Sequence, residues 1–513
     1  MGVIIRQSIK GTIVNYIGTA IGMVTLFFII PKYLTLEEMG LSRTLIDAGI
    51  LFVSLAQIGT NSSILRFFPY FKDPQKRDNG FFFWTLLIPI IGFLIYLTVF
   101  LLFKNFIAGY FQEKSALLVN YLYFILPLGF FMLYQTVFET NSVVLMRIVV
   151  PAFVREIGVR VMLLISYLLF AYGFLSLTGL IVSICCTYGI AASINLGYLF
   201  HLGRISLKPN FKHITKPLRK EFLFYTFFLM GSALTTAFVP SLGMFIIGAQ
   251  LGLAFAAIYG FARYIVALVE IPYRSLGSIS NPHVSQSIKD NNFIETNRFV
   301  KKVSLHQLLI GTAVFFVIWT NIDFIFQIIP NGANLASGKW VVFFLGLNAI
   351  IASSFTICGV SLSYSKFYYY SLVLTFIFTS LAVVMNLKCV PIWGINGAAL
   401  ATLFSSCIYF TLLVSLVYWK IKVIPFSWKQ LHILAIVLGL VLLNWLWKTY
   451  ATPIAMQYFN PTLWVSFFEA LIRTIVLGGI GFFSVYFLKI SDEVNGLIKK
   501  LCKNLQNPYT TCK

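Results

Sequence analysis

The sequence predicts an all-α membrane protein of about fourteen transmembrane helices. Three observations carry that prediction: the composition, the length of the apolar segments and the placement of the basic residues. Of the 513 residues, 59% are hydrophobic and 11% are charged, and the mean hydropathy is +0.87. Soluble domains carry about 25% charged residues, so this composition excludes a water-soluble fold.

Apolar segments long enough to span a bilayer follow one another along the chain. A helix crosses the hydrocarbon core with about 20 residues, and the polar gaps here are only about 5 to 20 residues long. Such gaps leave no room for a folded domain outside the membrane. The predicted helices, placed to within a few residues, are 11–31, 41–66, 81–103, 116–138, 152–172, 175–200, 221–246, 250–272, 303–328, 340–362, 367–387, 395–419, 431–449 and 464–488.

Basic residues collect in every second gap. With a cytoplasmic N-terminus, about 29 of the 38 lysines and arginines lie on the cytoplasmic side, as the positive-inside rule requires. The pattern predicts an inner-membrane protein with both termini, and the 201–220 loop, in the cytoplasm. The formal charge of +22 is then a topology signal. No nucleic-acid partner is expected, because such proteins present a contiguous basic face on a folded domain.

Cysteine and histidine usage predicts no disulfide framework and no metal centre. Four of the seven cysteines lie in apolar segments, and the five histidines show no metal-ligand spacing.

Two stretches of the chain indicate a repeat. Residues 34–73 and residues 251–290 each begin with leucine, enclose mainly apolar sequence and end in Lys-Asp. Both run from a predicted outer loop to a predicted inner loop, so the repeat would be parallel. Transporters built from parallel repeats hold their substrate path between the two halves.

Three strings resemble segments of bacterial polysaccharide flippases. Residues 31–69 are similar to the first outer loop and second helix of that family, including a glycine turn and an Arg-aromatic pair at Gly59, Arg66 and Phe67. Residues 258–272 are similar to its eighth helix. Residues 386–405 are similar to the junction between its helices eleven and twelve, at Pro391, Gly394, Asn396, Gly397, Ala398, Ala399, Ala401 and Thr402.

The resemblance covers essentially the whole chain. It implies the multidrug/oligosaccharidyl-lipid/polysaccharide exporter superfamily, in the branch that moves undecaprenyl-linked oligosaccharides. The implied architecture has two six-helix lobes around a central cavity, residues 1–220 and 221–420, and two further helices with a cytoplasmic tail, residues 421–513. The implied partners are a lipid-linked oligosaccharide and membrane lipids, with a polysaccharide polymerase or glycosyltransferases as candidates, and the expected state is a monomer.

The junction string also has a physical meaning of its own. Pro391 closes the preceding helix, Gly394 and Gly397 permit tight backbone turns, and the alanines that follow allow close helix packing. Ordinary packing explains these residues as well as a functional role does.

Charged residues inside predicted helices are the candidate binding residues, because a charge in hydrocarbon costs about 2.5–3.5 kcal/mol or more. Arg43 and Asp47 lie four residues apart and can pair on one helix face. Arg263 lies midway along its helix, with Glu270 two turns further. If the lobes pack as in relatives, these groups line the cavity, and arginines can hold the pyrophosphate of a lipid carrier. The alternative for Arg43 and Asp47 is a self-neutralised structural pair.

Two other arginines, Arg155 and Arg160, begin the fifth predicted helix. They either reach to lipid headgroups or form the inner mouth of the cavity. Glu469 and Arg473, four apart on the last predicted helix, favour a structural pair.

Asn15 and Pro240 complete the candidates. Asn15 marks the first predicted helix as polar and is assigned to substrate binding. Pro240 removes a backbone hydrogen bond inside the seventh, which makes it the hinge candidate. Several relatives carry a coupling carboxylate in one of these two helices, whereas here neither has Asp or Glu within its apolar stretch. No cofactor is predicted, and coupling to Na⁺ or H⁺ is left open.

The leading hypothesis is a flippase that carries a lipid-linked oligosaccharide to the outer leaflet by alternating access. A cation-coupled multidrug exporter on the same fold is the alternative; it would favour an acidic cavity. A membrane-bound glycosyltransferase or polymerase needs catalytic carboxylates or a large loop, and no loop here is long enough. The chain is therefore expected not to be an enzyme.

Overall fold

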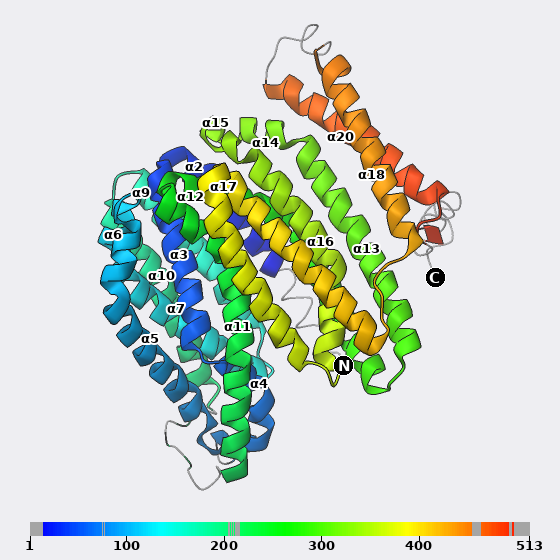
Figure 1. Cartoon of the computed structure of the whole chain (residues 1–513). Helices are drawn as coiled ribbons and strands as arrows, with labels where there is room; N and C mark the ends of the chain where they lie inside the picture. The colour runs from blue at the N-terminus through cyan, green and yellow to red at the C-terminus, as the bar shows by residue number, and fades with distance from the viewer. Residues whose placement is uncertain are drawn as a thin grey trace, which may run out of the picture. The chain divides into compact units, whose positions relative to one another are not determined.

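A computed structural model describes residues 14–73, 75, 77–203, 206, 208, 210, 216–453, 463–491 and 495–496. All regular structure in these ranges is helical, which confirms the all-α prediction (Figure 1). The first helix spans Val14–Tyr33. The elements, in chain order, are η1 (Thr25–Ile29), α2 (Ile30–Tyr33), α3 (Leu36–Ala56), α4 (Thr60–Phe71), η2 (Arg77–Gly80), α5 (Phe81–Gln112), α6 (Ala116–Tyr121), η3 (Leu122–Phe124), α7 (Ile125–Val144), α8 (Val149–Phe153), η4 (Val154–Gly158), α9 (Val159–Ala171), α10 (Leu177–His201), α11 (Lys216–Gln250), α12 (Leu253–Lys289), α13 (Phe293–Thr320), α14 (Ile322–Ile328), α15 (Gly332–Leu335), η6 (Ala336–Gly338), α16 (Lys339–Tyr364), α17 (Tyr369–Ile421), α18 (Trp428–Leu446), η7 (Trp447–Ala451) and α20 (Leu463–Phe487).

Eleven helices of the described ranges are long and apolar enough to cross a membrane, so the chain is a multi-pass membrane protein. The predicted number of fourteen is not confirmed by this count. Two predicted helices are joined in α17, and the predicted helix 152–172 is divided among α8, the π-turn η4 and α9. The predicted helix 221–246 falls within α11, many of whose side chains lie outside the described set, as does much of the 201–220 loop.

The two halves of α17 meet at the predicted glycine junction. Gly394 adopts φ 58° and ψ −139°, a backbone conformation that side chains other than glycine's rarely allow. A Cβ at Gly397 would overlap the carbonyl oxygen of Cys389, so glycine is required for the close return of the chain. Figure 1 shows the two legs of α17 folded back on each other. The prediction of tight turns at this string is confirmed.

The chain separates into two compact units. The first unit contains residues 1–261 with two short additions, 329–331 and 379–398, and the second unit contains the remainder. The lobe boundaries predicted at residues 220 and 420 stay a prediction.

In the first unit, α3, α5, α7 and α10 lie side by side around an aromatic core (Figure 1). Phe52 is fully buried and stacks edge-on against Tyr96 with ring centroids 4.3 Å apart. Glycines set the helix spacing: a Cβ at Gly129 would run into the Phe52 ring, and one at Gly92 would overlap the Ala56 carbonyl oxygen. Small residues at crossings of this kind bring membrane helices into van der Waals contact.

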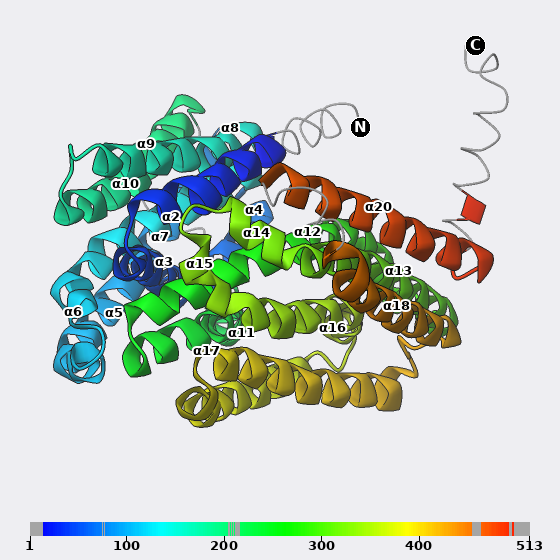
Figure 2. The ribbon, with the colours of Figure 1, turned by 90° about the horizontal axis from the view of Figure 1, so that it is seen from above.

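In the second unit, α13 packs on α16 and α18, and α18 lies beside α20, as Figure 2 shows from above. Arg473 of α20 has a side chain that is 5% exposed and joins α20 to the end of α13. Its Nη1 lies 3.1 Å from Glu469 Oε1, and its Nη2 donates to the Thr320 carbonyl at 2.9 Å. Glu469 Oε1 also accepts from Trp447 Nε1 and from the Thr452 hydroxyl. The predicted pairing of Glu469 with Arg473 is confirmed, and the pair fastens α20 to the end of α13.

We expect Arg473→Met to lower the free energy of unfolding by about 3–5 kcal/mol, because it strands the carboxylate of Glu469 in the packed interior. Thermal unfolding in detergent measures the effect. The double variant Arg473→Met/Glu469→Gln should recover much of the loss, since neither charge then remains. An Arg473→Met protein as stable as wild type would show that the pair has no structural role.

Candidate functional site

The Arg43–Asp47 pair lies on α3, about two turns into the helix. The helix begins with a capping box in which the Thr35 hydroxyl and the Glu38 carboxylate each accept a hydrogen bond from the other residue's backbone N–H. Arg43 Nη2 lies 2.7 Å from Asp47 Oδ1. The Asp47 side chain is 1% exposed, whereas that of Arg43 is 20% exposed. The predicted pairing is confirmed, and it fixes a guanidinium group that keeps an accessible edge.

The start of α12 packs directly on α3 beside this pair. A Cβ at Gly40 would overlap the carbonyl oxygen of Leu253, and a Cβ at Gly260 would lie 3.4 Å from Arg43 Cγ. Two glycines, one from each helix, therefore allow this crossing. Phe261 of α12 also meets Phe27 of the first helix edge-on, with centroids 5.3 Å apart. The aliphatic part of Arg43 is thus held against α12 while its guanidinium group faces Asp47.

The turn between α11 and α12 is fastened to the α5–α6 turn at the same end of the first unit. The buried Ser115 hydroxyl donates to the Gly248 carbonyl at 2.5 Å. Gly252 adopts φ +107°, and a Cβ there would lie 3.0 Å from the Lys114 carbonyl oxygen. By the topology predicted from charge, this end is the outer one. The contacts hold the α11–α12 turn against the helices that precede it.

We expect Gly40→Val to lower the midpoint of thermal unfolding by several degrees, because the new side chain meets backbone that cannot move without separating α3 from α12. Gly109→Val on α5 is the matched control, since nothing lies within 4 Å of a Cβ at that position. A Gly40→Val protein as stable as the Gly109→Val control would contradict the tight crossing.

A second charged cluster joins α7, η4 and α9. Arg155 donates to Glu139 and, through Nε at 2.9 Å, to Glu156. Arg160 Nη2 donates to the other oxygen of Glu156 at 2.7 Å. Both carboxylate side chains are 15% exposed, whereas the arginines are 47% and 32% exposed. The two arginines and two glutamates form one network without net charge, in which the arginine side chains are more exposed than the carboxylates.

The first helix rests on this network through its glycines. A Cβ at Gly18 would overlap the Glu156 carbonyl oxygen, and one at Gly22 would lie 3.4 Å from the Arg160 side chain. π-turns such as η4 displace one residue from the regular helical stack and are frequent at functional sites. Arg155 and Arg160 are both paired in this network and stay partly exposed. Whether they contact lipid headgroups or form the inner mouth of a cavity, and their assigned role in substrate binding, stay predictions.

Glu139 was not among the candidates from the sequence. It lies sixteen residues before Arg155 and on another helix, so no helical spacing links the two residues. In the sequence, the feature that could have identified Glu139 is its position: it is a carboxylate at the end of an otherwise uncharged apolar segment.

The remaining candidates are placed individually. Arg263 and Glu270 are both half-buried on α12, seven residues apart. Asn15 is exposed on the first helix, and its carbonyl accepts from the Thr19 hydroxyl at 2.8 Å. Pro240 is exposed within α11, which continues as helix on both sides of it. The substrate-binding roles of Arg263, Glu270 and Asn15, and the hinge at Pro240, stay predictions.

Asp323, on the short helix α14, binds two lysines. Its Oδ1 lies 2.5 Å from Lys339 Nζ and its Oδ2 lies 2.7 Å from Lys448 Nζ. Partial burial alone would raise the pKa of Asp323, but the two ammonium groups outweigh it and hold the pKa below its usual range. The cluster links α14 with α16 and η7.

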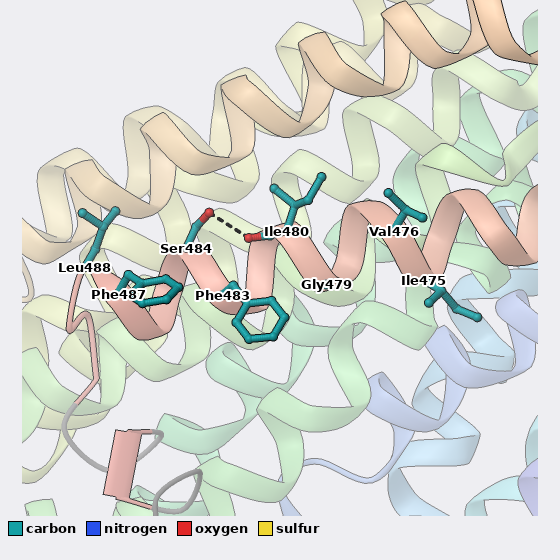
Figure 3. Close-up of a pocket in the computed structure, with 8 residues that line it drawn as sticks. All are labelled: Ile475, Val476, Gly479, Ile480, Phe483, Ser484, Phe487 and Leu488. Carbon is teal, nitrogen blue, oxygen red and sulfur yellow. Dashed lines mark hydrogen bonds between the residues drawn. The ribbon is translucent and has the colours of Figure 1, made fainter. Parts of the chain in front are cut away.

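No group of three or more His, Cys, Asp or Glu side chains capable of holding a metal ion occurs among the residues that the structure describes. The pocket in Figure 3 is a groove along one face of α20. It is lined by Ile475, Val476, Gly479, Ile480, Phe483, Ser484, Phe487 and Leu488. Its one hydroxyl, on Ser484, donates to the Ile480 carbonyl at 2.7 Å. The groove offers hydrocarbon contact, as a lipid tail requires, and no group that recognises charge.

Comparisons with known proteins agree with this architecture. The family described as "Polysaccharide biosynthesis protein" matches residues 4–288. No curated protein matches the chain in sequence. The solved structure "Lipid II flippase MurJ, inward closed conformation" superposes with a TM-score of 0.70 at 12% identity, covering 93% of this chain and 99% of that chain.

Transporters of the MATE family share the fold as well. An inward-facing multidrug resistance MATE family transporter of the MOP superfamily gives a TM-score of 0.60 at 12% identity, over 80% of this chain and 98% of that chain. A MATE transporter mutant from Vibrio cholerae gives 0.55 at 13% identity, over 82% and 98%. At these identities the likeness establishes a common fold.

Proposed function

Because the chain belongs to the polysaccharide biosynthesis protein family, we propose that it is a flippase for an undecaprenyl-pyrophosphate-linked oligosaccharide. It carries this lipid from the inner to the outer leaflet by alternating access, for the assembly of a surface polysaccharide. The fold it shares with a lipid II flippase supports the proposal. No covalent step is needed, because the sugar headgroup crosses through a polar path while the polyprenyl tail stays in lipid.

The observation that carries this proposal is the pairing of three carboxylates with arginines in membrane-spanning segments of the chain. Asp47 is bound by Arg43, Glu139 by Arg155, and Glu469 by Arg473. In each pair the carboxylate is at most 15% exposed, so it is committed to its arginine. In the pairs on α3 and at η4 the guanidinium group is the more accessible partner, and guanidinium groups recognise phosphate oxygens through bidentate hydrogen bonds.

A cation-coupled multidrug exporter remains the second candidate because the MATE structures share the fold. A lipophilic cation would need a carboxylate to neutralise its charge away from water. To use Asp47 or Glu139, it would first have to displace an arginine. The free-energy cost of breaking such an ion pair makes a cationic cargo less favourable than an anionic one.

The remaining features of the proposal follow from the sequence. The protein resides in the cytoplasmic membrane with both termini in the cytoplasm, acts as a monomer, and catalyses no covalent reaction. A polysaccharide polymerase or glycosyltransferases are its candidate protein partners. Coupling to Na⁺ or H⁺ is left open.

Reconstitution into liposomes tests the proposal. A fluorescent polyprenyl-pyrophosphate oligosaccharide in both leaflets should become fully accessible to a membrane-impermeant quencher only when the protein is present. A labelled phosphatidylcholine is the control, because it should stay protected in the inner leaflet. Equal movement of both lipids would indicate nonspecific scrambling, and movement of neither would contradict a flippase.

A further inference from the structure

The second unit carries a set of exposed and half-buried lysines and aromatic rings where α16 ends and where α17 both begins and ends. We name it the lysine–aromatic patch. Its members are Lys366, Phe367, Tyr370, Tyr418, Trp419, Lys420 and Lys422. The charge pattern of the sequence predicts that this end lies at the cytoplasmic leaflet.

The rings hold the ammonium groups in place. Lys420 Nζ lies 3.6 Å from the centroid of the Trp419 ring, and it also approaches the rings of Phe367 and Tyr370, at 5.4 and 5.5 Å. Lys366 lies over Phe367 at 5.4 Å and Lys422 over Tyr418 at 5.2 Å. A cation held on a ring face keeps N–H donors for an anion on its open side. In the patch, each of three lysines lies over at least one aromatic ring.

The chain beneath the patch is anchored in a hydrophobic core cluster of the second unit. Ile421 and Val423, which alternate with the lysines, are buried in a core cluster with Leu362 of α16 and Leu374 of α17. Lys422 caps the C-terminus of α17 in the left-handed conformation, with φ 60°, and is exposed. The apolar residues anchor the turn, and the intervening lysines face outward.

No carboxylate neutralises these lysines from the same part of the chain. The sequence contains no aspartate or glutamate between Asp323 and Glu469. At the opposite end of α16, by contrast, a lysine does have an acidic partner: Lys339 forms an ion pair with Asp323. The nearby α12–α13 turn uses its own carboxylates internally: Asp290 accepts from Gln286, and Glu295 accepts from Asn292.

We propose that the lysine–aromatic patch binds the headgroups of anionic phospholipids of the cytoplasmic leaflet, through their phosphate oxygens. Positive charge that has no acidic partner among the residues the structure describes complements an anionic membrane surface, where each basic residue contributes about 1 kcal/mol. Exposed tryptophan and tyrosine suit the same depth, because their rings settle at the headgroup level. None of the patch residues is among the residues assigned to cargo binding.

Native mass spectrometry of the purified full-length protein, with phosphatidylglycerol and phosphatidylcholine as probes, tests the proposal. Wild-type protein should retain phosphatidylglycerol preferentially. Lys420→Gln/Lys422→Gln should weaken that retention by about 30-fold, as expected for two basic residues. Lys420→Arg/Lys422→Arg should retain it. The matched control Lys301→Gln/Lys302→Gln removes two charges from α13 and should bind as wild type does.

Three outcomes would overturn the proposal. They are equal retention of the two lipids by wild type, an equal loss in the α13 control, and release of the lipid by millimolar inorganic phosphate, which would identify a free-anion site. If the glutamine variant does not fold, Trp419→Leu provides an independent test. It keeps every charge but removes the ring beneath Lys420, so retention should fall by about 2- to 30-fold; unchanged retention would contradict the ring-held geometry.

Discussion

Replacing Arg263 by alanine should reduce export of surface polysaccharide by about 10- to 100-fold, with the protein still present in the membrane at nearly its normal level. The expected loss corresponds to one charge-assisted hydrogen bond to phosphate, about 1.5–3 kcal/mol. Arg263 is half-buried on α12, and it belongs to the same helix whose first turns pack on Arg43. Lysine at this position should restore transport in part, because it keeps the charge but loses the bidentate geometry.

Arg298→Ala is the matched control for that experiment. Arg298 is an exposed arginine of α13, on the side predicted to be cytoplasmic, so the same change there should leave export unaffected. Surface polysaccharide is measured in cells that contain equal amounts of each protein. Wild-type levels in the Arg263→Ala strain would exclude this arginine from the cargo path. A loss matched by Arg298→Ala would point to a general effect of positive charge.

The features that the sequence predicted well are those set by local spacing. Arg43 and Asp47 are four residues apart on one helix, and four-residue spacing places side chains on one face. Gly394 and Gly397 follow a proline within six residues, and such strings specify backbone geometry directly. Apolar length likewise predicted membrane-spanning helices, because the bilayer imposes that length on any sequence.

The features that the sequence missed depend on which helices meet. Glu139 reaches Arg155 only because α7 packs against η4, and no periodicity along either helix records that contact. The contacts of Arg473 with Thr320 depend in the same way on α20 lying against the end of α13. The predicted count of fourteen helices is not confirmed. Two predicted helices, 367–387 and 395–419, are the two legs of α17, which meet at the kink at Gly394.

The two candidate functions differ most clearly in the charge of the cargo that they require. Purified protein should bind polyprenyl-pyrophosphate saccharides in a saturable manner, and added salt should weaken that binding because the contact is ionic. Lipophilic cations should show no comparable affinity, because the carboxylates of Asp47 and Glu139, which could neutralise them, are already paired with arginines. Fluorescence or calorimetric titration with both classes of ligand measures the difference.

Asp47→Asn decides between the two functions in cells. In a flippase, Asp47 positions Arg43, whose Nη2 lies 2.7 Å from the carboxylate, so the amide should weaken polysaccharide export without creating or removing dye resistance. In a cation exporter, the same change would remove the charge that binds the drug. Asp290→Asn, at an exposed carboxylate near the end of α12, is the matched control and should alter neither phenotype. Dye resistance that is lost in Asp47→Asn cells while polysaccharide export stays intact would reject the flippase and establish the exporter, because only a cationic cargo depends on that carboxylate directly.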